Sequence, residues 1–92
     1  GSATVSWQAD GRAGVQGYRV TAVSQQLVPG PQPAPPRVDV GQRAGCGEVT
    51  ATLAGLTPGV PYVFWLEEAL LDGTTGVTEY VQVGWSPPVV IA

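Results

Sequence analysis

Few side chains of this 92-residue chain could carry out chemistry, and their types and spacing argue against catalysis. The chain contains no histidine, so it cannot assemble a Ser–His or Cys–His nucleophile by itself. Its single cysteine, Cys46, lies between two glycines, and a lone cysteine cannot form a zinc site. We expect Cys46 to be a free, exposed thiol, with an intermolecular disulfide or a partner in another segment as alternatives.

The carboxylates are also poorly placed for acid–base or metal chemistry. Glu67 and Glu68 are adjacent, so on a strand they face opposite sides and cannot act as a pair. Asp10 and Asp72 each precede a glycine in a turn-like stretch, where an aspartate side chain bonds nearby backbone. Scattered carboxylates do not make a calcium cage. We therefore expect no catalytic residue, no metal site and no cofactor.

Three aromatic residues in the C-terminal third are the candidate binding residues. If Phe64 points into a core, the alternation of a strand turns Trp65 outward. Tyr80 should point outward on the same face, and Trp85 lies just beyond it. Exposed aromatic residues are typical of surfaces that bind a sugar ring or a neighbouring domain. The alternative is that long side chains such as that of Arg19 lie across the rings, which then only support the sheet.

These residues belong to a series of short alternating segments separated by turns. We expect strands over residues 3–7, 17–23, 37–40, 48–56, 62–71 and 77–83. No segment has the apolar stripe and caps of a helix, so we expect none of consequence. Short strands of this number predict a two-sheet sandwich with one core. The large side chains expected in it are Trp7, Tyr18, Leu53, Leu56, Phe64 and Leu66.

The segment LTPGVPY, Leu56 to Tyr62, has the spacing needed to cross from one sheet to the other. In such sandwiches a tyrosine at the corner packs inward, and its hydroxyl bonds to backbone a few residues upstream. We expect Leu56 to fill the core before the crossover and Pro58-Gly59 to form the turn. Gly59 should take the positive φ that other residues resist, and Tyr62 should begin the next strand.

In these residues the chain resembles the fibronectin type III family. The L-x-P-G-x-x-Y corner, the strand ATVSW with an inward Trp7 and the strand GYRV with an inward Tyr18 occur in the family's order. The resemblance runs from about Ser2 to Val83. It implies an all-β, immunoglobulin-like Greek-key β-sandwich, with strands A, B and E in one sheet and C′, C, F and G in the other. It implies no catalytic activity. We predict a sandwich over residues 1–83 and a strand extension or linker over 84–92.

The chain departs from the family pattern in two places that affect the fold. Only two residues precede ATVSW, so strand A is cut away, supplied by another chain or replaced by the tail PPVVIA. We expect the tail to continue strand G and the edge of strand B to stay free. Glu68 falls at an inward position, where an unpaired carboxylate is costly. An arginine could pair with it, but we favour a bulge after Leu66 that turns Glu68 outward and Ala69 inward.

Composition limits the partners. The net charge is −3, and all four cations are arginines without a basic stripe, which argues against nucleic acid. The apolar runs are too short to span a bilayer, and no signal peptide remains at the start. The lack of lysine, asparagine and methionine, beside abundant alanine, glycine and proline, indicates a high-GC coding source.

Together these features predict a non-catalytic module of a larger secreted or cell-surface protein. Its expected role is to separate or orient neighbouring domains of the same polypeptide. Domains resembling it often sit between the catalytic and carbohydrate-binding parts of extracellular glycan-degrading enzymes in high-GC bacteria. One alternative is a binding module that holds a glycan or partner protein with Trp65, Tyr80 and Trp85. Another is a sandwich packed against a catalytic domain that lies outside this sequence.

Overall fold

The computed structural model describes residues 1–9, 14–26, 30, 34–41 and 47–91. Within this part the chain forms strands and no helix, as the alternating segments predict. The strands are β1 (Ala3–Gln8), β2 (Val15–Ser24), β3 (Arg37–Gly41), β4 (Glu48–Leu53), β5 (Pro61–Leu71), β6 (Thr78–Trp85) and β7 (Val89–Val90).

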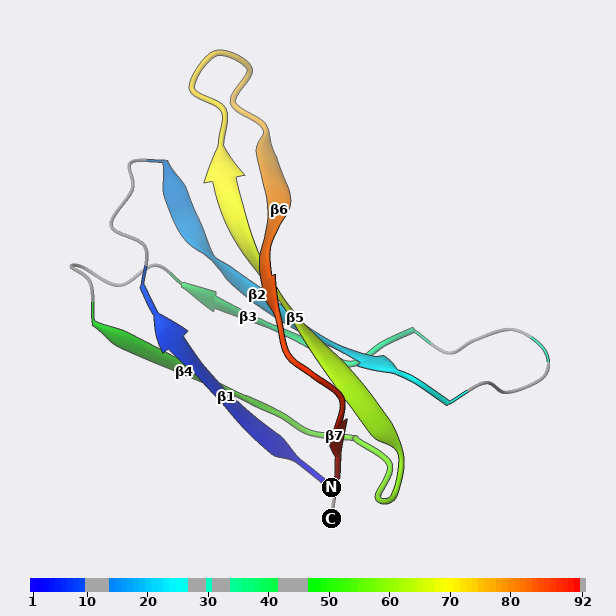
Figure 1. Ribbon diagram of the computed structural model, residues 1–92. Coiled ribbons are helices and arrows are strands. Elements are labelled where there is room, and N and C mark those ends of the chain that lie inside the picture. Colours follow the sequence, from blue (N-terminus) through cyan, green and yellow to red (C-terminus); the bar gives the residue numbers. More distant parts are fainter. Residues whose placement is uncertain (10–13, 27–29, 31–33, 42–46, 92) are drawn as a thin grey trace.

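The strands form two sheets that pack face to face (Figure 1). In the first sheet β1 pairs with β4, and in the second the order is β3-β2-β5-β6, with β7 paired to the start of β5. Every pairing is antiparallel. When the strands are matched in chain order to the expected pattern, β1 and β4 correspond to strands B and E. Strands β3, β2, β5 and β6 correspond to C′, C, F and G. The all-β sandwich and its strand order are therefore confirmed.

The core consists of two clusters of buried apolar side chains, linked by side chains that contact both. The linking residues Trp7, Val40 and Leu66 are partly buried. The ring of Trp7 meets Tyr18 edge-on, with 5.4 Å between ring centroids and 64° between planes. The larger cluster contains Val20, Ala22, Ala51, Leu53, Leu56, Val60, Tyr62, Phe64 and Ile91, and the smaller contains Ala9, Val15, Tyr18 and Val49.

The corner between β4 and β5 has the geometry that LTPGVPY predicts. Leu56 is buried, and the backbone N–H of Thr57 donates to the Tyr62 hydroxyl at 2.9 Å. Gly59 has a φ of 81°, in the region that favours glycine. The N–H of Val60 closes the turn on the carbonyl of Thr57 at 3.3 Å. The Tyr62 side chain and the backbone of the turn thus both help to fix the corner.

Removal of the corner hydroxyl is expected to weaken the fold. Tyr62→Phe should lower the free energy of unfolding by about 1–2 kcal/mol, because the Thr57 N–H loses its acceptor. Urea denaturation followed by tryptophan fluorescence measures the difference. The control is Tyr80→Phe, on the exposed side of β6, which should change stability by about 0.5 kcal/mol or less. Equal losses in the two variants would show that the corner bond contributes nothing.

The C-terminal tail continues the line of β6 along the same edge of β5, as expected. Pro61 and Tyr62 pair with Val90 and Val89. Ser86 bridges the break between β6 and β7, since its N–H donates to Phe64 O at 2.9 Å and its hydroxyl accepts from Phe64 N at 3.0 Å. The pairing of β6 and β7 with β5 therefore extends into the segment 84–92. The domain boundary at residue 83 stays a prediction.

Glu68 corrects the sequence-based expectation. It is only 3% exposed and lies opposite Tyr18 on the inner face of β5, so the predicted outward turn is wrong. A bulge does occur beside Leu66, but the extra residue is Val83 on β6. Because β5 itself is not bulged there, its alternation continues and Glu68 stays inward while Ala69 faces outward. Glu68 makes a polar contact within the protein, as burial of a carboxylate requires.

Candidate functional site

The outer face of the second sheet carries all three predicted binding residues. Trp65 on β5 lies directly opposite Trp85 on β6, and their exposed fractions are 40% and 74%. Tyr80, 40% exposed, lies opposite Ala69 further along the same two strands. The structure therefore brings the two tryptophans together as a cross-strand pair. Tyr80 is separated from them by one intervening pair of residues.

Polar side chains lie between the tryptophan pair and Tyr80. The intervening pair is Glu67 and Gln82, and Glu67 also lies opposite Arg19 of β2. A carboxylate and an amide beside exposed rings can accept and donate hydrogen bonds to hydroxyl groups. The tryptophan pair with Glu67 and Gln82 is called the outer aromatic face below. Sequence reasoning identified its rings and did not identify these two polar neighbours.

Arg19 lies across one of the predicted rings. Its guanidinium carbon is 3.7 Å from the centroid of the Tyr80 ring, a cation–π distance. On its other side the guanidinium makes two bonds to Asp39 of β3, Nε to Oδ1 at 2.8 Å and a terminal nitrogen to Oδ2 at 3.3 Å. One face of the Tyr80 ring is therefore occupied by Arg19, the contact that the structural alternative expects.

The same contact shifts the titration of both charged groups. The hydrogen bond from Arg19 has the largest effect and lowers the pKa of Asp39. Burial acts in the opposite direction and is smaller than the hydrogen bond, and the positive charges of Arg19 and Arg37 also lower this pKa. That bond raises the pKa of Arg19. A carboxyl whose folded-state pKa is lowered stabilises the fold above its unfolded-state pKa and loses this contribution as pH falls through the folded-state pKa. The contribution is small because Asp39 is well exposed.

Arg19→Ala is expected to return the pKa of Asp39 towards its ordinary value of 3.8. The reason is that the largest lowering effect, the hydrogen bond, is lost with the guanidinium. A titration of the side-chain carboxyl resonances by NMR measures it. Arg37→Ala is the matched control, since Arg37 acts on Asp39 through charge alone and should move the pKa less. A larger rise in the control would contradict the assignment.

Of the two turn aspartates and the cysteine considered in the sequence, the structure describes Asp72, which has a structural role. Asp72 accepts from the N–H groups of Thr74 at 2.8 Å and Thr75 at 3.4 Å, which confirms it as a turn former. These bonds lower its pKa. Asp10 and Cys46 lie outside the described residues. Among the residues that are described, no three metal-ligating side chains come together, and no helix is long and apolar enough to cross a membrane.

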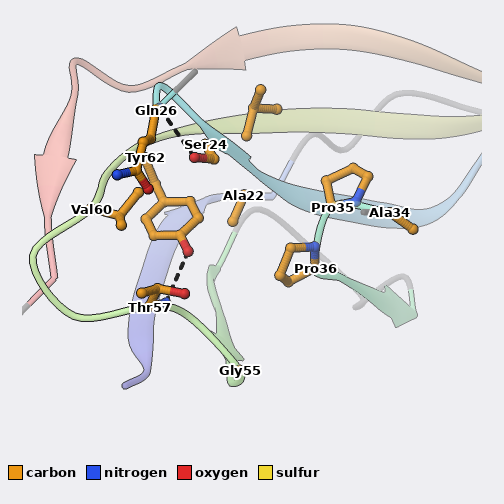
Figure 2. A pocket seen from close by; sticks show the side chains of 11 residues that line it. Ala22, Ser24, Gln26, Ala34, Pro35, Pro36, Gly55, Thr57, Val60 and Tyr62 are labelled. Atoms are coloured by element: carbon orange, nitrogen blue, oxygen red, sulfur yellow. Dashed lines mark hydrogen bonds between the residues drawn. The ribbon is translucent and has the colours of Figure 1, made fainter. Parts of the chain in front are cut away.

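A hollow of about 480 Å³ opens beside the corner between β4 and β5. Figure 2 shows the Tyr62 ring at its centre, with its hydroxyl directed to Thr57 and with Pro35 and Pro36 on the opposite wall. The described residues that line it include no carboxylate, cation or cysteine, and most of what they offer is apolar contact. This hollow was not predicted from the sequence.

Comparison with known proteins agrees with the strand order and the corner. The family model described as Fibronectin type III domain matches residues 1–82. No curated protein and no solved structure gives a significant match. Domains of this family are generally non-catalytic and commonly occur in extracellular proteins. Since the family model matches most of the chain, and the two sheets carry the strand order that the family implies, the protein belongs to the fibronectin type III domain family.

Proposed function

We propose that the protein is a non-catalytic module that holds neighbouring parts of a longer extracellular polypeptide in a fixed relative position. The observation that carries the proposal is that both ends of the described chain are bonded to one loop. The Gly1 amino group donates to Leu56 O at 2.8 Å, and Leu56 N donates back to Gly1 O at 3.1 Å. Three residues further along this loop, Gly59 N donates to Ile91 O at 2.8 Å.

The two ends consequently lie beside each other at the same end of the sandwich (Figure 1). Ile91 is buried in the larger core cluster, so the C-terminal end is held by packing as well as by backbone bonds. The loop that holds both ends is itself fixed by the bond between Thr57 and Tyr62. Segments joined at these two points would leave side by side. The arrangement favours an orienting role over linear separation.

A distance measurement between the two ends tests the orienting role. Dyes on cysteines added before Gly1 and after the C-terminal residue, in a Cys46→Ser background, should give efficient resonance energy transfer. Ile91→Ser should reduce the transfer and broaden its distribution, because the tail loses its place in the core. Val90→Ser is the matched control, since Val90 is exposed. Inefficient transfer in the parent protein would refute the proposal.

The wider context of the proposal is a secreted or cell-surface protein of a high-GC bacterium, with glycan-degrading enzymes as candidate parents. What supports it is the composition, which lacks lysine, asparagine and methionine, and the lack of histidine. The coding sequence on either side tests this context directly. A catalytic or carbohydrate-binding domain is the expected neighbour. A gene that encodes this sandwich and nothing else would contradict it.

A second candidate function is binding at the outer aromatic face, favoured by the opposed and exposed Trp65 and Trp85. A pyranose ring can stack on a tryptophan while Glu67 and Gln82 bond its hydroxyls. For one or two such rings we expect a dissociation constant on the order of 0.1–1 mM. Neighbouring domains or a partner protein are the other occupants of this face.

Tryptophan fluorescence tests the second candidate with cellohexaose and chitohexaose as probes. Quenching that saturates is expected, and Trp65→Ala should remove most of it without unfolding the protein. Tyr80→Ala is the control, because Arg19 covers one face of that ring and its loss should leave most of the response. No quenching by either oligosaccharide at about 10 mM, well above the expected dissociation constant, would exclude glycan binding here.

A further inference from the structure

Glu67 on the outer aromatic face has a carboxylate without a counter-ion. The residue is half-buried, yet it makes no hydrogen bond and no ion pair with any residue that the structure describes. Its carboxylate oxygens remain accessible from outside. Partial burial of a negative charge costs free energy unless an opposite charge approaches it. Glu67 is therefore placed to attract a cationic ligand.

The arginine nearest to Glu67 in the sheet is committed to other groups. Arg19 lies opposite Glu67 on β2. Its guanidinium makes two bonds to Asp39 and lies over the ring of Tyr80. Glu67 contributes least among the groups that raise the pKa of Arg19. Arg37, the other arginine in the described part of the chain, is on β3, two strands away from Glu67. The charge of Arg19 is thus balanced by Asp39, and the charge of Glu67 is left uncompensated.

Two exposed tryptophans lie beside this carboxylate. Trp65 precedes Glu67 by two residues on the same face of β5, a separation of about 6.5 Å along a strand. Trp85 lies opposite Trp65 on β6. The faces of an indole ring carry negative electrostatic potential, and tryptophan attracts a nearby cation more strongly than the other aromatic residues do. Glu67 and both indoles therefore favour the same kind of ligand, one with a positive charge.

We propose that the outer aromatic face binds an amino sugar whose amino group is free and protonated. The pyranose ring stacks on Trp65 or Trp85, and the ammonium group donates hydrogen bonds to Glu67. Gln82, opposite Glu67, bonds a neutral hydroxyl group of the same sugar. The inference rests on the binding function given above as the second candidate, and it adds the charge of the ligand.

Other ligands would use fewer of these groups. A lysine side chain carries the same ammonium, but its flexible stem loses conformational freedom on binding and has no ring to stack on the indoles. A quaternary ammonium has no N–H group, so it cannot donate to a carboxylate. An N-acetylated sugar keeps the ring but lacks the positive charge. An amino sugar combines the ring, the hydroxyl groups and the ammonium, which match the tryptophans, Gln82 and Glu67 respectively.

The probes are chitohexaose and the glucosamine hexamer that results when its acetyl groups are removed. Tryptophan fluorescence in mildly acidic buffer, where the amino groups are protonated, measures both affinities. We expect the glucosamine hexamer to bind about tenfold more tightly, the size of effect that a charge-assisted hydrogen bond with a cation–π contact gives. The difference should decrease as salt is added, because salt screens the attraction between accessible charges.

Glu67→Gln is the decisive variant, because it keeps the shape of the side chain and removes its charge. It should weaken binding of the glucosamine hexamer by roughly tenfold and change chitohexaose binding by about twofold or less. Glu79→Gln is the matched control, because it changes the net charge by the same amount from the opposite face of β6. The control should keep both affinities within about twofold of the parent protein's. The amide spectra of both variants show whether they are folded.

Equal affinity of the parent protein for the two hexasaccharides would overturn the inference and leave the binding function of the face standing. Failure of both to bind would overturn the inference and the binding function together. Equal losses in Glu67→Gln and Glu79→Gln would assign the attraction to overall charge and so reject the role of Glu67.

Hexalysine separates an amino sugar from any other cation. We expect it to bind more weakly than the glucosamine hexamer, because it has no pyranose ring for the tryptophans. Binding of hexalysine as tight as that of the glucosamine hexamer would overturn the assignment to an amino sugar. The orienting function does not depend on any of these results, since the energy-transfer measurement tests it separately.

Discussion

Phe64→Ala is expected to lower the free energy of unfolding by about 3–5 kcal/mol, the usual cost of deleting a buried phenylalanine ring. Phe64 is 5% exposed and belongs to the larger core cluster, where it lies between the two sheets. Loss of the ring leaves a cavity between the two sheets, and the side chains around it cannot move enough to fill it. The total stability expected for a domain of this size is only about 5–14 kcal/mol, so a large part of it would be lost.

The neighbouring residue gives the control for this prediction. Trp65 is a larger aromatic residue on the same strand, but it points to the outer face and is 40% exposed. Trp65→Ala should therefore cost about 1 kcal/mol or less, in the range of substitutions at the surface. Urea denaturation of both variants measures the difference. If Trp65→Ala were the more damaging change, the assignment of faces along β5 would be wrong.

The faces of the strands could be predicted because each depends on the chain's own alternation. Once Phe64 is assigned to the core, a period of two puts Trp65 outside without any knowledge of the neighbouring strands. The corner could be predicted for a similar reason. Its bond joins Thr57 and Tyr62, five residues apart, and its turn needs a glycine where LTPGVPY supplies Gly59. Features that depend only on residues close together in the chain can therefore be predicted from that short segment alone.

Features that depend on the register between strands could not be predicted in the same way. A residue inserted near Leu66 can be absorbed by either strand of the pair, and the sequence does not say which one. The bulge was expected on β5 and occurs at Val83 on β6, so Glu68 remains inside. The same choice builds the candidate site. Without the extra Val83, the register that pairs Glu67 with Gln82 would place Gly84 opposite Trp65 and Trp85 opposite the inward-facing Phe64.

The contact of Arg19 with Tyr80 is another consequence of long-range register. Arg19 is on β2 and Tyr80 is on β6, with β5 between them. The contact is possible where the intervening residues are small, and Gly17 and Ala69 lie opposite each other at this level of the sheet. The sequence suggested Arg19 as a residue that could cover a ring. Which ring it would cover followed only from the pairing of three strands.

Gly17→Ala is the second substitution expected to have a large effect. A Cβ at this position would lie 2.5 Å from the carbonyl oxygen of Val40 and 3.3 Å from the Cα of Gly41. Both contacts are to the backbone of β3, so no side chain can rotate away. Overpacking of this kind costs about 1–3 kcal/mol. We expect a value near the upper end, because relief requires β3 to move from β2.

Thermal melting should therefore show a lower midpoint for Gly17→Ala, by roughly 10–20 °C for a domain of this size. Gly84→Ala is the control, since a Cβ there meets no atom within 4 Å and the residue has no positive φ. That variant should keep the midpoint or raise it, because alanine restricts the unfolded chain by about 0.4–1 kcal/mol relative to glycine. Hydrogen exchange separates the possible causes: faster exchange in Gly17→Ala should begin in β3, where the clash acts. If the exchange rose uniformly, or if Gly84→Ala melted as early, the loss would reflect strand propensity and not the contact with Val40.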